Sequence, residues 1–246
     1  MPAFQIVGHR GARNEAPENT IAGFLHARRL GLAAVELDVH LSSDGRLVVI
    51  HDGTVDRTTD GAGPVGDFTA AELASLDARA AFPDWPERVG VPTLDEVLDA
   101  LGDMPSIQIE IKKDTDARME RLADAVLRVI HERQLESRVV LSSFEVHAIE
   151  AIGQLVPSQA RAYIGAYDTP AYLDTALRLG CTQVDIALKT SSRETVAAAH
   201  REGLRVVGFQ CNSPDALEQC LDWGVDAATS DEPTTMLELL ASRRGR

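Results

Sequence analysis

The sequence is poor in cysteine and in aromatic residues. Its 246 residues include three cysteines, Cys181, Cys211 and Cys220, and no two of them form a Cys-x-x-Cys pair. An odd number without paired spacing argues against a disulfide framework or a zinc knuckle, so a reducing compartment is the simpler interpretation. No cysteine has a base beside it in the sequence, and we expect these residues to lie in the core or at the surface.

Basic residues are outnumbered by acidic ones. The chain has 24 lysines and arginines against 38 aspartates and glutamates, which gives a formal net charge of -14. We therefore expect no nucleic-acid partner and no stable association with an anionic membrane. An anionic substrate must instead meet positive charge that is local to its binding site.

Several segments with a recognisable purpose are also missing. No apolar run suggests a membrane span, and MPAFQIVGHRG lacks the basic region and apolar region of a secretory signal, so we expect a cytoplasmic protein. The sequence contains no Gly-x-Ser-x-Gly elbow, no His-Glu-x-x-His helix and no Walker A loop. The parts that acyl transfer would need are therefore absent.

What the sequence does contain is an alternation of short apolar runs with amphipathic segments. The helical segments close at glycines such as Gly31, Gly180 and Gly203. The strand-like runs are FQIVG, AAVELDV, SIQIEI, RVVLSS, ARAYIG, QVDIA, RVVGF and DAATS. This order predicts a single α/β domain over 1–246, a TIM barrel with eight parallel strands. A doubly wound open sheet is the alternative, and the acidic residues at several strand ends favour the barrel.

One segment departs from this alternation. After VELDVHL come SSDGR and LVVIHD, so that Asp-Gly rather than a helix joins two strand-like runs and predicts a β-hairpin after the second strand. If Asp44 and Gly45 form a two-residue loop, counting back along both runs places Asp38 opposite His51. The alternation of side chains then puts Glu36 on the same face.

Ionisable residues gather at the predicted carboxyl ends of the first three strands. The set comprises His9, Arg10, Glu36, Asp38, His51, Glu110 and Lys112. Carboxylates on one strand face cannot be buried without compensation, so we expect a hard divalent cation beside them. Carboxylates for a cation, histidines for proton transfer and basic residues for an anion predict a metal-assisted phosphoryl-transfer site.

The stretches around this set resemble the glycerophosphodiester phosphodiesterase family. GHRGARNEAPENT is similar to its HRG...PENT opening, and ELDVHLSSDGRLVVIHDGTVDRTTDGAG resembles its E-x-D...HD segment with the following R-T-T-x-G. VPTLDEVLDAL, IEIK, VVLSSF and TSDEP also fit the family. The resemblance spans essentially the whole chain and implies a TIM barrel.

The resemblance also implies a role for each residue of the set. The implied roles are metal ligand for Glu36, Asp38 and Glu110, acid or base for His9 and His51, and phosphate contact for Arg10 and Lys112. The implied cation is Mg²⁺ or Ca²⁺. Phe209 stands where many members have tryptophan, so we expect it to form an aromatic wall of the substrate pocket.

The implied activity is hydrolysis of a glycerophosphodiester to sn-glycerol 3-phosphate and an alcohol. A non-catalytic binding protein on the same fold is disfavoured, because no part of the motif is missing. A lysophospholipase D activity would need an apolar ramp at the barrel mouth, which the sequence does not show. The alcohol, the choice of cation, the histidine that acts as acid and the oligomeric state are left open.

Some of these residues have a simpler structural interpretation. Asp38 with Arg10, or Glu36 with Lys112, would form ion pairs inside a barrel, although the two nearby histidines favour chemistry. GAGPVG formally matches Gly-x-Gly-x-x-Gly, but it contains Pro64 and opens no helix, so we interpret it as a loop.

Other histidines have ordinary explanations. His26, His131 and His200 lie in helical patterns, where a solvated or partly packed histidine is expected. His40 is a candidate for the rim of the site at most, and His147 begins a helix, where capping or surface placement is expected.

Residues 52–92 form the least barrel-like part of the chain and are rich in Gly, Pro, Asp and Thr. We expect an insertion after the hairpin with one short helical piece, TAAELASLDARA. Phe82 and Trp85 either line the leaving-group side of the site or staple the insertion to the barrel, and both alternatives stay open.

Overall fold

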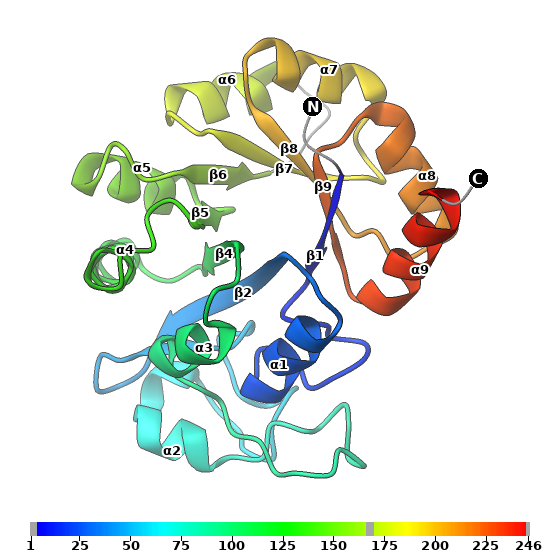
Figure 1. Ribbon diagram of the computed structural model, residues 1–246. Helices are drawn as coiled ribbons and strands as arrows, with labels where there is room; N and C mark the ends of the chain where they lie inside the picture. Colours follow the sequence, from blue (N-terminus) through cyan, green and yellow to red (C-terminus); the bar gives the residue numbers. More distant parts are fainter. Residues whose placement is uncertain (1–3, 166–169, 245–246) are drawn as a thin grey trace.

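The structure, a computed structural model, describes residues 4–165 and 170–244 (Figure 1). Its strands are β1 (Gln5–Gly8), β2 (Ala34–Leu41), β3 (Leu47–Val49), β4 (Ser106–Ile111), β5 (Val139–Ser143), β6 (Arg161–Ile164), β7 (Gln183–Ala187), β8 (Arg205–Phe209) and β9 (Ala227–Ser230). Its helices are α1 (Ile21–Arg29), α2 (Ala70–Ser75), α3 (Leu94–Leu101), α4 (Asp116–Glu132), α5 (Val146–Leu155), α6 (Pro170–Arg178), α7 (Arg193–Arg201), α8 (Pro214–Trp223) and α9 (Pro233–Arg244), with a 3-10 helix η1 (Val65–Asp67).

Eight of these strands close into a parallel barrel. The sheet runs in the order β1-β9-β8-β7-β6-β5-β4-β2-β3, and β1 also pairs with β2, which closes it. The helices that follow the barrel strands surround it (Figure 1). The predicted TIM barrel is confirmed, and the open sheet is wrong. All parallel strands point the same way, so their carboxyl ends meet at one rim.

The layer between strands and helices supplies most of the core. Leu37, Ile109 and Leu141 on the barrel strands are fully buried. The longest helix, α4, buries residues at spacings of three and four. They are Met119, Leu122, Ala123, Val126, Leu127 and Ile130. Each large aliphatic side chain buried in this layer stabilises the fold by about 1.5 to 3 kcal/mol, and this holds the rim in place.

The hairpin exists, but its predicted register is wrong. β3 runs antiparallel to β2 and pairs Val39 with Val49, so Asp38 faces Ile50 rather than His51. The loop has three residues because Gly45 adopts φ +77° and its N–H donates to the Ser42 carbonyl at 3.1 Å. A glycine in the left-handed conformation at the third loop position is typical of this longer turn. The extra residue shifts every pair by one.

His51 nevertheless lies close enough to Asp38 for the charge of that carboxylate to act on its imidazole. β3 ends at Val49, so His51 stands beyond the ladder and its side chain is not fixed by the alternation of the strand. The segment between β3 and α3 then forms the predicted insertion, which contains η1 and α2. It packs on the outer side of the hairpin through a small apolar cluster of its own. The cluster comprises Val48, Ile50, Val55, Val65, Leu73, Ala78 and Val91.

Two composition-based expectations also have structural counterparts. All three cysteines are buried and free, so they are core residues. In the part of the chain that the structure describes, no helix is both long enough and apolar enough to cross a membrane.

Candidate active site

A tight turn after β1 carries His9 and Arg10. Arg10 has φ +52°, a left-handed conformation that is strained for a residue other than glycine. This turn directs the backbone N–H of Arg10 to Glu36 Oε2, 3.1 Å away. The next residue must be glycine, since Gly11 has φ +88° and a Cβ there would lie 2.9 Å from the backbone carbon of Gly23 in α1. The HRG motif thus packs the first rim loop against α1 and the second strand.

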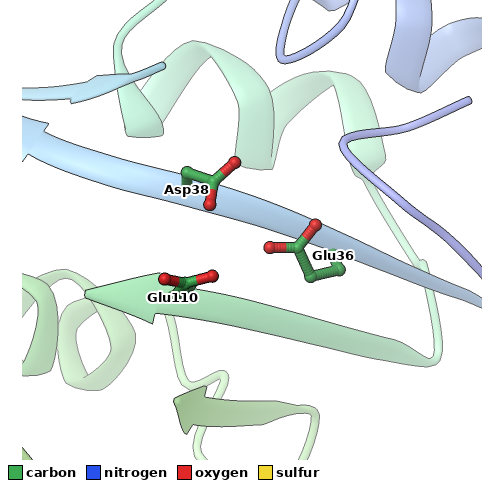
Figure 2. Close-up of side chains that lie close together, drawn as sticks. All are labelled: Glu36, Asp38 and Glu110. Atoms are coloured by element: carbon green, nitrogen blue, oxygen red, sulfur yellow. The ribbon is translucent and has the colours of Figure 1, made fainter. Parts of the chain in front are cut away.

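Three carboxylates meet at the rim on the neighbouring strands β2 and β4. Glu36 and Asp38 come from β2 and Glu110 from β4, and Figure 2 shows their carboxylates directed toward one another. Asp38 and Glu110 are paired in register, so the two strands place them side by side. One oxygen from each residue lies within 4.8 Å of the others, and all three residues are buried.

The proximity of these groups changes their acidity. Burial, followed by the charges of Asp38 and Glu110, raises the pKa of Glu36 well above its ordinary value. Burial and the charge of Asp38 raise the pKa of Glu110 to about 7. Burial acts in the same direction on Asp38, but the charges of Lys112 and Arg10 outweigh it and keep its pKa below the ordinary value. The cluster therefore has an unmet demand for positive charge.

Two basic residues supply part of that charge. Lys112 Nζ lies 2.7 Å from Glu110 Oε1 and 3.4 Å from Asp38 Oδ1. Arg10 Nη1 lies 2.9 Å from Glu18 Oε1, and Arg10 Nε lies 3.4 Å from Asp38 Oδ2. The simpler structural interpretation expected two ion pairs here. The pair of Arg10 with Asp38 is present, whereas Lys112 pairs with Glu110 and not with Glu36.

The cluster fits a hard divalent cation. Its donors are carboxylate oxygens, the ligands that Mg²⁺ and Ca²⁺ prefer. Asp38 Oδ1 is buried and accepts no hydrogen bond from the described residues, so it has a lone pair available for a metal. Glu36, Asp38 and Glu110 are therefore the residues that could hold a cation.

Each of the two predicted histidines is held by a carboxylate through Nδ1. His9 Nδ1 lies 2.5 Å from Asp231 Oδ1, and His51 Nδ1 lies 2.6 Å from Asp52 Oδ1. Burial lowers the pKa of both histidines. With Nδ1 engaged, Nε2 is the nitrogen that remains for proton transfer, and in His9 it lies 3.9 Å from Glu36 Oε2.

A chain of ion pairs connects the two halves of the site. Glu18 accepts hydrogen bonds from Arg10 and from Arg57, whose nitrogens lie 2.8 and 2.9 Å from its oxygens. Arg57 also donates to Asp52, and this hydrogen bond lowers the pKa of Asp52 to about 2. Asp52 in turn holds His51. Glu18 and Arg57 had no predicted role, although both lie in the quoted PENT and R-T-T stretches.

Other supporting residues come from segments distant in sequence. Asn19 Nδ2 donates to Asp38 Oδ2 at 2.8 Å. Asp231, which follows β9 in the TSDEP stretch, also accepts a hydrogen bond of 2.7 Å from Asn212 Nδ2. Asn19 and Asp231 each lie in one of the quoted motifs, whereas Asn212 does not, and no sequence pattern revealed the partners of these three residues.

These residues surround a pocket of about 160 Å³ at the rim. The pocket is lined by His9, Arg10, Glu36, His51, Gln108, Glu110, Phe144, Ile164, Asp185, Phe209, Gln210 and Thr229. Six of the eight predicted site residues thus line one cavity. Of the other two, Asp38 and Lys112, each contacts a lining residue. Phe209 forms a wall together with Phe144, and their ring centroids lie 6.4 Å apart, edge to face.

The remaining candidates lie outside this pocket. Phe82 and Trp85 pack edge to face on each other, and neither lines the pocket. His40 supports the site indirectly, because its Nε2 lies 3.2 Å from the carbonyl oxygen of His51. The other histidines pair with acidic side chains elsewhere. The pairs are His26 with Glu15, His131 with Glu136, His147 with Glu120 and His200 with Asp226.

Comparison with known proteins agrees with this geometry. Residues 9–235 match the model of the glycerophosphoryl diester phosphodiesterase family. The chain is 33% identical over 236 residues to a glycerophosphodiester phosphodiesterase of Caldanaerobacter subterraneus, with 96% of this chain and 97% of the relative covered. A Bacillus altitudinis glycerophosphodiester phosphodiesterase is 33% identical over 239 residues, with 96% and 97% covered.

A solved structure has the same fold. It is that of an Oleispira antarctica phosphodiesterase in complex with the product sn-glycerol-3-phosphate, and it shares 28% identity, a TM-score of 0.90 and 96% coverage of each chain. The family match, the full-length relatives and the carboxylate-lined rim of the barrel lead to one conclusion. This chain belongs to the glycerophosphodiester phosphodiesterase family of enzymes.

Proposed function

We propose that this chain is a single catalytic domain that hydrolyses glycerophosphodiesters to sn-glycerol 3-phosphate and an alcohol with the help of a divalent cation. The observation that carries the proposal is the meeting of three buried carboxylates, two carboxylate-held histidines and Arg10 around one pocket. The Oleispira antarctica relative, whose structure holds sn-glycerol-3-phosphate, supports the choice of product.

Glu36, Asp38 and Glu110 would hold Mg²⁺ or Ca²⁺. When bound, the cation would supply positive charge to the phosphate oxygens and stabilise charge that develops during the reaction. Arg10 and Lys112 neutralise the carboxylates in this structure. With the carboxylates engaged by the cation, Lys112 would be released to bind the phosphate, and Arg10 would bind it while Glu18 still holds its Nη1.

The two histidines would move the protons. One accepts a proton from the nucleophile, and the other donates a proton to the leaving alcohol oxygen. Asp231 and Asp52 fix the ring orientation and stabilise the protonated imidazole of His9 and His51, respectively. Phe209 forms the wall against which the substrate packs.

The test is a panel of glycerophosphodiesters of choline, ethanolamine, glycerol and inositol, assayed for released sn-glycerol 3-phosphate with and without metal. We expect activity to disappear with a chelator and to return with Mg²⁺ or Ca²⁺. Glu110→Gln should weaken the metal response, whereas Glu202→Gln, at an exposed residue after α7, should not. Full activity in metal-stripped protein would overturn the metal assignment, and no product from any compound would overturn the activity.

The expected surroundings of the enzyme belong to the same proposal. Its partner would be a small-molecule glycerophosphodiester rather than nucleic acid, in keeping with the net charge of -14. A cytoplasmic location stays a prediction.

A further inference from the structure

A buried polar network forms the floor of the pocket. Gln108 Nε2 donates to Ser142 Oγ at 3.2 Å and to Asp185 Oδ2 at 2.5 Å. Gln183 Nε2 donates to Gln108 Oε1 at 2.9 Å and to Asp185 Oδ1 at 2.8 Å. An amide nitrogen carries two hydrogens, so the donors of both glutamines are fully used.

Two groups at this floor keep hydrogen-bonding capacity. Each oxygen of Asp185 accepts a bond from a glutamine amide and retains a further lone pair. Thr229 on β9 lines the same pocket and is 5% exposed. Its Oγ1 is buried without a hydrogen-bond partner among residues 4–165 and 170–244. A buried hydroxyl without a partner is destabilising, which indicates that a ligand completes it.

The chemistry of these two groups selects the ligand. Asp185 is a carboxylate and can only accept, so a carbonyl or an anion in the ligand is disfavoured. A cation would satisfy Asp185 but would leave the hydroxyl of Thr229 without an acceptor. A ligand hydroxyl satisfies both, because it donates to Asp185 and accepts from Thr229.

The depth of the floor indicates which hydroxyl it is. Gln108 pairs in register with Glu36 and precedes Glu110 by two residues on β4, so the floor lies at the level of Glu36 and about 7 Å along the strand below Glu110. The mouth is apolar and open, since Phe144 is 49% exposed beside Phe209. A phosphodiester bound at the carboxylates would therefore extend its short glycerol chain to the floor and its variable alcohol toward the mouth.

We propose that Thr229 and Asp185 bind the terminal hydroxyl of the glycerol half of the substrate and determine specificity for it. The inference rests on the proposed function. These two residues would make the enzyme selective for glycerol over propane-1,2-diol at this half of the diester. Other contacts would bind the alcohol at the mouth.

The experiment compares kcat/KM for glycerophosphocholine with that for its propane-1,2-diol analogue, which lacks only the terminal hydroxyl. The bond to the neutral hydroxyl of Thr229 corresponds to a factor of about ten and the bond to the carboxylate of Asp185 to more, so together they predict a preference of at least about a hundredfold in the wild type. Thr229→Val keeps the shape of the side chain and should lower the preference by about tenfold. Thr229→Ser restores the hydroxyl and should restore the preference.

Thr182→Val is the matched control, since Thr182 is exposed and precedes β7 at the opposite end of the barrel. It should keep the wild-type preference. If Thr229→Val keeps the wild-type preference, the inference is overturned, and the Thr229 hydroxyl bonds to water and not to the substrate. The inference would also be overturned if Thr229→Val changed the ratio of kcat/KM between the choline and ethanolamine diesters but not the preference for the terminal hydroxyl.

Failure of the proposed function gives a different result, namely no product from either compound. Calorimetry with sn-glycerol 3-phosphate and with propane-1,2-diol 1-phosphate then tests, independently of turnover, whether Thr229 and Asp185 bind the terminal hydroxyl. The wild type should bind the glycerol compound more tightly, and Thr229→Val should lose about tenfold of that difference. Equal binding of the two compounds by the wild type overturns the inference.

Discussion

The buried carboxylate at the pocket floor should make the stability of the fold depend on pH. Burial raises the pKa of Asp185 to about 6 from an ordinary value of 3.8, although the hydrogen bonds from Gln183 and Gln108 act in the opposite direction. Because the folded state binds this proton more tightly than the unfolded state, Asp185 contributes stability that is fully present below pH 4. That contribution is lost as the pH rises through about 6.

The magnitude follows from the pKa difference. About two pKa units correspond to about 3 kcal/mol in total, and about 1.3 kcal/mol of it is lost between pH 5 and pH 7. Asp185→Asn removes the titration while it keeps the size of the side chain. The wild-type advantage over Asp185→Asn in the free energy of unfolding should therefore shrink by about 1.3 kcal/mol across this range.

The assay is urea unfolding of both proteins at several pH values between 5 and 7.5, with a chelator present throughout so that metal binding does not contribute. Asp84→Asn, at an exposed position in the insertion, is the matched control and should show no such change. A difference between wild type and Asp185→Asn that is constant over this range would refute the reasoning. It would mean that the two glutamine amides compensate fully for burial of the charge.

Two further predictions concern the partner of His9 and the turn of the hairpin. Asp231→Asn should lower kcat for glycerophosphocholine by about a hundredfold or more, because it removes the carboxylate that orients His9. Glu120→Gln is the control, since it removes the carboxylate partner of His147 outside the pocket, and it should leave kcat unchanged. Comparable activity in the two variants would show that His9 needs no such partner. Gly45→Ala should lower the free energy of unfolding by about 1 kcal/mol, because Gly45 has φ +77°. Gly53→Ala is the control and should cost much less, since a Cβ at Gly53 would meet open space and the backbone there is not left-handed. Equal losses in urea unfolding would contradict the assigned turn.

The fold and the composition of the rim could be predicted from the sequence because both depend on periodic patterns. Alternation along VELDV places Glu36 and Asp38 on one face, and parallel strands bring Glu110 beside them. The hairpin register could not be obtained in this way. It depends on whether the loop around Asp44 has two or three residues. The left-handed backbone of Gly45 and the hydrogen bond of 2.9 Å from the Arg46 N–H to Ser42 Oγ together close the longer loop.

Residues that support the site were harder to predict for a different reason. Asp231 lies 222 positions from its partner His9. No local pattern can reveal such a contact, because it exists only when the barrel closes between β9 and β1. The proximity of His51 to Asp38 was predicted with a wrong register. It arises because β3 ends before His51, and strand pairing does not impose it.

The ion-pair chain from Arg10 through Glu18 and Arg57 to Asp52 has a consequence for the evolution of specificity. Arg57 belongs to the insertion, whereas Arg10 belongs to the barrel, and Glu18 binds both. A change in the insertion that displaces Arg57 therefore releases the partner of His51 and alters the charge around Arg10. Under the proposed function, selection for a new alcohol through this segment would act on turnover as well as on binding, unless Arg57 keeps its place.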